Sequence, residues 1–174
     1  MSSAESTVTG EHADLLKALA TQRNFLRRTV QGLTDEQAAQ RTTVSDLCLG
    51  GIIKHVAFTE RQWARFIEEG PAAMSYGTDE ASASSWLDGF RMLPGETLAG
   101  LLEKYDAVAA QTDELVAGGL DLDATQPLPP APWFEPGATW TARYVIMHIH
   151  AELAQHSGHA DIIRESLDGA KTMG

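Results

Sequence analysis

Residues 148–161 bring together side chains that can bind metal ions, within one stretch of helical pattern. An α-helix turns by about 100° per residue, so Glu152 and His156, which are four residues apart, point the same way. His148 and His159 lie within about 40° of Glu152, whereas His150 points roughly to the opposite side. The segment therefore predicts one helix face that carries a carboxylate and several imidazoles.

That face is otherwise apolar, because Val145 and Ile163 lie on the same stripe as Glu152 and His156. A buried ionised carboxylate without a partner is very costly. A metal ion is one suitable partner, and a network of hydrogen bonds is another. On an exposed face, the same pair of residues would add only a weak side-chain contact.

His55 is the candidate third ligand from another helix, because it lies between Ile52 and Thr59 on the inward stripe of its own helical pattern. A catalytic zinc ion takes three protein ligands and keeps one position open. Two histidines and a carboxylate suit Zn²⁺, but also Fe²⁺, Ni²⁺ or Mn²⁺. The alternative is that His55 is a hydrogen-bonded core residue.

A ligand set from the last helix alone does not work. His148 and His159 lie about 16 Å apart along a helix, at about 1.5 Å per residue, so both cannot reach one ion. A second helix must therefore supply a ligand, and His148 and His159 are candidates for lining a pocket beside the metal.

Other chemical signals are weaker. Cys48 is read as a small buried residue, although a helix N-terminus can lower a thiol pKa. No phosphate-binding glycine loop, CxxC pair or nucleophile elbow is present. Trp133 and Phe134, which lie among prolines, are loop anchors or a lid over a pocket. Arg143 and Arg164 are predicted to form surface ion pairs, with the binding of an anionic group as the alternative.

Composition narrows the classes of partner. The 174 residues predict one domain over 1–174, with residues 1–10 as a flexible tail. The formal net charge of -11 argues against nucleic acid and anionic membranes as partners. A small basic cluster, Arg23, Arg27 and Arg28, is predicted to be a solvated helix face.

Localisation follows from what the chain lacks. A single cysteine fits a reducing compartment, and the first residues show no apolar signal core. No stretch approaches the roughly 20 apolar residues of a membrane span. We therefore expect a cytoplasmic protein, either a monomer or a homodimer.

The hydrophobic spacing predicts four long helices, over residues 11–31, 45–69, 96–117 and 139–167. Ser45 and Thr139 are the expected N-caps of the second and fourth, and Gly169 the stop of the last. Thr34 and Gln37 form a capping-box pattern for a short helix.

The connections between the helices are long. Gly50 and Gly51 weaken the start of the second helix and would allow a neighbour or ligand to come close. Residues 72–94 predict a long loop with a short helical turn, and residues 120–139 an extended, proline-rich connection that could hold a short hairpin. No convincing strand pattern appears. The fold class is therefore all-α, a four-helix bundle with long loop connections, for which a crossover is possible.

The chain resembles the DinB-like superfamily of metal-binding four-helix bundles over roughly residues 13–169. The resemblance rests on the segment from Leu49 to His55, which continues to Trp63, on the loop-rich spacing, and on the last helix from His148 to Asp161 and beyond. It implies that a histidine of the second helix and an i, i+4 pair of the last helix bind a divalent metal, often zinc.

Many superfamily members have histidine at both positions of the pair, whereas this chain has Glu152 at the first. The resulting set of His55, Glu152 and His156 looks like that of mycothiol-dependent maleylpyruvate isomerase, a relative with an added domain. The resemblance therefore implies the mycothiol-dependent branch, in which single-domain relatives join a low-molecular-weight thiol to small electrophiles in detoxification.

By that resemblance we expect a metal-dependent thiol S-transferase, with zinc as the metal and mycothiol as co-substrate. Three other functions stay open: metal-assisted isomerisation or hydrolysis of a small molecule, a non-catalytic metal-binding stress-response module, and a metal-free bundle with a buried histidine network. Fold and metal ligands do not fix the substrate.

Overall fold

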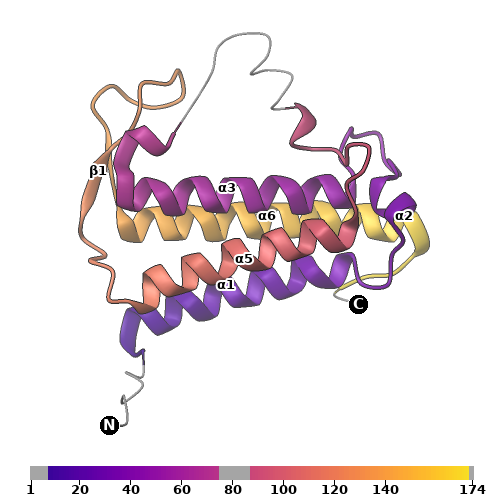
Figure 1. The fold of residues 1–174 in the computed structure, drawn as a ribbon, viewed down its shortest axis with the longest axis horizontal. Helices are drawn as coiled ribbons and strands as arrows, with labels where there is room; N and C mark the ends of the chain where they lie inside the picture. Colours follow the sequence, from indigo (N-terminus) through magenta and orange to yellow (C-terminus); the bar gives the residue numbers. More distant parts are fainter. Residues whose placement is uncertain (1–7, 75–86, 173–174) are drawn as a thin grey trace.

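The protein is an all-α bundle, as its hydrophobic pattern predicts (Figure 1). The computed structural model describes residues 8–74 and 87–172. The four long helices are α1 (Gly10–Thr29), α3 (Leu49–Glu69), α5 (Leu98–Ala117) and α6 (Ala142–Asp168). The shorter elements are α2 (Asp35–Ala39), the 3₁₀ turn η1 (Gly70–Ala73), β1 (Thr125–Pro127) and β2 (Thr139–Thr141). No helix within the described ranges is long and apolar enough to cross a membrane.

The chain contains the crossover that the long connections allow. Lys54, near the start of α3, forms an ion pair of 2.8 Å with Glu96, which lies just before α5. The two helices therefore run parallel, as Figure 1 shows. Helix α6 runs antiparallel to α3, since His55 meets His156 while Trp63 meets His148.

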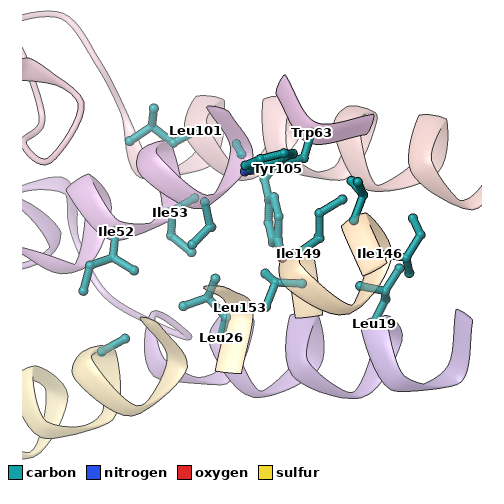
Figure 2. Close-up of a cluster of buried hydrophobic side chains, with 14 of the residues drawn as sticks. Leu19, Leu26, Ile52, Ile53, Trp63, Leu101, Tyr105, Ile146, Ile149 and Leu153 are labelled. Atoms are coloured by element: carbon teal, nitrogen blue, oxygen red, sulfur yellow. The ribbon is translucent and has the colours of Figure 1, made fainter. Parts of the chain in front are cut away.

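The core lies between all four helices, and α3 contributes more than half of its residues to the buried interior. Figure 2 shows its centre, where aliphatic side chains surround the buried ring of Tyr105. The labelled members include Leu19, Leu26, Ile52, Ile53, Leu101, Ile146, Ile149 and Leu153. This apolar packing fixes the rotation of α3 and α6 and so decides which of their polar residues face each other.

The helix ends are set by local hydrogen bonds, and two predicted N-caps are wrong. The Thr34–Gln37 capping box is present, and α6 ends at Gly169 in the left-handed conformation. Helix α3 begins after Cys48 and not after Ser45, whose hydroxyl accepts a bond from the amide of Leu47 in a local turn. Helix α6 is capped by Thr141, the last residue of β2, whose hydroxyl accepts a hydrogen bond from the amide of Tyr144; Thr139 begins that strand.

The proline-rich connection does contain the short hairpin. Strands β1 and β2 pair antiparallel, with Gln126 opposite Trp140. The Gln126 side chain donates to the carbonyl of Ile67 at 3.2 Å, which attaches the hairpin to the end of α3. Strands of three residues are too short for an alternating pattern, which is why the sequence shows none.

The prediction that Arg23 lies on a solvated face is wrong. Its side chain is 3% exposed and pairs with Glu60, which is 1% exposed, and with Asp113 at 2.7 Å. Arg23 lies in register with Leu19 and Leu26 on the buried stripe of α1, so the helix carries it inward. A charge pair links α1 to α3 inside the apolar core, whereas Arg28 is exposed as predicted.

We predict that Arg23→Met lowers the free energy of unfolding by about 3–5 kcal/mol, because it leaves the Glu60 carboxylate buried without its partner. Urea denaturation followed by circular dichroism measures the loss. Arg28→Met, on the exposed side of the same helix, is the matched control and should change little. Equal losses in the two variants would contradict a specific role of the buried pair.

Candidate metal centre

The structure brings His55, Glu152 and His156 together at the interface of α3 and α6. One ligand atom of each lies within 4.8 Å of the others, although His55 is about a hundred residues away along the chain. His55 is placed by the inward stripe of α3, and the other two by successive turns of α6. The three residues predicted from the sequence therefore form one cluster.

Two histidines of α6 lie beside the Glu152 carboxylate. Nε2 of His156 lies 3.6 Å from Oε2 of Glu152, and Nε2 of His148 lies 3.7 Å from Oε1 of the same carboxylate. The rings of His55 and His156 meet edge to face, with their centroids 4.7 Å apart. His55 and His156 are buried, whereas the Glu152 side chain is 28% exposed. The cluster is thus enclosed by protein on the histidine side and reached by solvent at the carboxylate.

The environment favours the protonation states that metal binding needs. Burial lowers the pKa of His55 to about 4, assisted by the nearby His156 and opposed by Glu152, so this imidazole is neutral at neutral pH. The contact with His156 holds the pKa of Glu152 below its usual value, against the effect of burial. Metal ligands must be neutral imidazoles and ionised carboxylates. The donor set is therefore ready to bind a cation.

The donor set also fits a divalent ion in its dimensions. Ligand bonds of about 2.0–2.2 Å place the donor atoms of a tetrahedral site about 3.3–3.6 Å apart. The His156–Glu152 distance of 3.6 Å already meets this spacing, and the other ligand atoms lie within 4.8 Å of one another. Three protein ligands with a solvent-exposed side match an open, catalytic arrangement and not a closed structural one.

Phe90, to which the sequence pattern gave no role, packs against His55. Its ring stacks on the imidazole with centroids 4.1 Å apart and planes inclined by 23°. The ring is also 6.4 Å from that of His156. Phe90 therefore limits the rotation of one candidate ligand and excludes water from it.

The loop that carries Phe90 can approach only because α3 has glycine beneath it. A Cβ atom on Gly51 would lie 1.9 Å from the carbonyl oxygen of Phe90, a backbone atom that cannot simply rotate away. At Gly50 the added atom would meet the flexible Met92 side chain instead. The close approach predicted at these glycines is thus made by the chain itself, and it holds Phe90 against His55.

Comparison with known proteins shows the family of this chain. The model of the mycothiol S-transferase family matches residues 14–169. The chain belongs to the mycothiol S-transferase family. This agrees with the resemblance to DinB-like bundles and with the mycothiol-dependent branch.

One solved structure, a conserved protein from Enterococcus faecalis, is similar with a TM-score of 0.67 at 12% identity. The match covers 94% of this chain and 100% of that one, and it shows a shared fold alone. No curated protein matches the sequence.

The remaining histidines of α6 divide as their spacing suggests. His148 touches Glu152, and burial lowers the pKa of His148. The His159 ring lies 5.4 Å from that of His156, and its Nδ1 is buried. Both therefore border the cluster without belonging to it. His150 is not part of it.

The other candidate groups have structural partners. Cys48 is 2% exposed, in keeping with a small buried residue. Arg143 pairs with Glu11 and Asp123, and Arg164 pairs with Asp168. Arg164 also donates to the carbonyls of Thr29 and Gln31, at the end of α1. These contacts confirm ion pairing for both arginines. A cleft of about 950 Å³ between α1, α2 and α5 contains none of the candidate ligands.

We predict that Gly51→Ala weakens zinc binding by about tenfold or more, because the new methyl group displaces the Phe90 backbone and frees the His55 ring. Competition with a chromophoric chelator gives the dissociation constant. Gly158→Ala is the matched control, since a Cβ there meets nothing within 4 Å and Gly158 lies on α6 near the cluster. An unchanged zinc affinity in folded Gly51→Ala protein would refute the role of Phe90.

Proposed function

We propose that this protein transfers mycothiol to small electrophiles at a divalent metal, with zinc the best fit, held by His55, Glu152 and His156. The observation that carries the proposal is the convergence of these three groups in a chain of the mycothiol S-transferase family. When bound, the metal would hold the thiol as a thiolate near neutral pH, since metal ions deprotonate coordinated thiols.

Each protein group has a definite part in this reaction. His55 and His156 would supply nitrogen donors from the buried side, and Glu152 an oxygen donor on the side that solvent reaches. Phe90 keeps water away from His55. His148 and His159 border the same space, where they would orient the substrate.

The chemical step forms one sulfur–carbon bond. The thiol proton is released to solvent when the thiol binds. The sulfur then attacks the electrophilic carbon, and the leaving group departs with its bonding electrons. Positioning the two reactants supplies much of the acceleration, because the reacting atoms must be held about 3–3.5 Å apart in line.

Metal content is the first test. Wild-type protein purified from zinc-supplemented cells should contain about one metal ion per chain by elemental analysis, as three converging ligands predict. His55→Ala and His156→Ala should each lose it. His150→Ala is the matched control and should keep the metal, because His150 lies on the same helix outside the cluster. Metal-free wild-type protein would leave a buried histidine network as the role of these residues.

The thiol reaction is the second test. With monochlorobimane, the zinc-loaded protein should accelerate conjugation of mycothiol, with loss of chloride, and His156→Ala should reduce the rate to the uncatalysed one. Fluorescence of the conjugate gives the rate, and parallel reactions with bacillithiol and glutathione test the choice of thiol. Metal-loaded protein that consumes none of these thiols would refute the transferase and favour an isomerase, a hydrolase or a non-catalytic module.

A further inference from the structure

Five residues spaced by four form a row that leads from the chain before α6 to the candidate metal centre. In order they are Trp140, Tyr144, His148, Glu152 and His156. Within α6 each step of four residues advances about 6 Å, so Tyr144 lies about 12 Å along the helix from Glu152. The row connects the metal cluster with an aromatic region at the other end.

The side chains of this row touch one another. The Trp140 ring lies 4.7 Å from that of Tyr144 and 5.1 Å from that of His148. Phe134 packs on Trp140 from the loop between the strands, at 5.6 Å. We define the aromatic platform as Phe134, Trp140 and Tyr144. His148 bridges the platform to the carboxylate of Glu152.

One side of the platform packs against a buried residue, whereas part of the platform is exposed to solvent. Trp63, which is 5% exposed, stacks under Trp140 with centroids 4.8 Å apart and planes inclined by 19°. Tyr144, by contrast, is 50% exposed, and Met147 beside it on α6 is 54% exposed. Packing of the hairpin explains the burial of aromatic rings, but not why large apolar side chains stay in solvent. Tyr144 and Met147 are therefore accessible to a ligand that reaches along α6 from the candidate metal centre.

We propose that the aromatic platform binds the carbohydrate part of the thiol co-substrate, an inference that rests on the proposed function. Mycothiol carries its cysteine on a glucosamine linked to inositol. With the sulfur at the metal centre, these rings lie farther along the molecule, toward the platform. Sugar rings stack their apolar faces on Trp and Tyr, while their hydroxyl groups use the polar tips of such residues.

Distance favours the thiol over the electrophile as the occupant. The electrophilic carbon has to approach the sulfur to about 3–3.5 Å, which keeps a small electrophile beside Glu152 and His156. The platform lies about 12 Å away along α6, beyond a small electrophile but within reach of the longer thiol. The electrophile therefore binds at the metal end of the row, and the carbohydrate at the aromatic end.

The test uses a probe without sulfur, N-acetylglucosaminyl inositol, in isothermal titration calorimetry with the full-length protein. It should bind wild-type protein and His156→Ala protein equally, since it has no thiol to place at the metal. This separates the two hypotheses. If the probe binds but the protein lacks the metal or does not conjugate mycothiol, the proposed reaction is refuted and the platform is not. If conjugation is normal but the probe does not bind, the platform is refuted and the proposed reaction is not.

Tyr144→Ala should raise the dissociation constant of the probe about five- to tenfold, as expected for the loss of one stacking ring. It should also raise KM for mycothiol with kcat unchanged, as loss of uniform binding does. Tyr144→Phe should retain most of the affinity, because it keeps the ring. Phe58→Ala, which removes an exposed aromatic residue from α3, is the matched control and should change nothing.

Three results would overturn the assignment. The first is an unchanged dissociation constant in Tyr144→Ala. The second is an equal loss in Phe58→Ala, which would show that the effect is not local. The third is that an unreactive bimane binds in a way that depends on Tyr144 while the sugar probe does not bind. The platform would then bind the electrophile and not the carbohydrate.

Discussion

The interface between α3 and α6 has to bury two imidazoles beside a carboxylate inside an apolar bundle. Desolvation is costly for a charged group, and here it keeps His55 neutral while the contact with His156 keeps Glu152 ionised. The outcome is a set of electron-pair donors that suits a divalent cation. Because of the crossover, α3 runs parallel to α5, and α6 runs antiparallel to α3. This arrangement places His55 of α3 opposite His156 of α6.

The surroundings of this interface act on it indirectly. Gly51 has no Cβ atom to clash with the backbone of Phe90, so the Phe90 ring can stack on His55. On the far side of α3, the pair between Arg23 and Glu60 ties the same helix to α1. Helix α3 is thus held on two sides, by Phe90 at His55 and by Arg23 at Glu60.

Family membership and geometry carry different parts of the functional argument. The match to mycothiol S-transferases covers most of the chain and directs attention to a thiol. The fold alone would not, because the similar protein from Enterococcus faecalis shares architecture at 12% identity. The proposed metal centre would explain how a thiol is activated, and the proposed aromatic platform would hold the rest of that molecule.

The sequence by itself determined the helices and the nature of the cluster. Helical spacing depends only on local geometry, so it placed Glu152 and His156 on one face, and the inward stripe of α3 singled out His55. The tertiary structure decided three further features: the register of α3 against α6, the stacking of Phe90 on His55, and the partner of Arg23. These contacts join residues far apart in the chain, and they depend on helix rotation and loop path, which no local pattern encodes. Arg23 had a local signal, its register with Leu19 and Leu26, but only the buried Glu60 opposite makes a charge tolerable there.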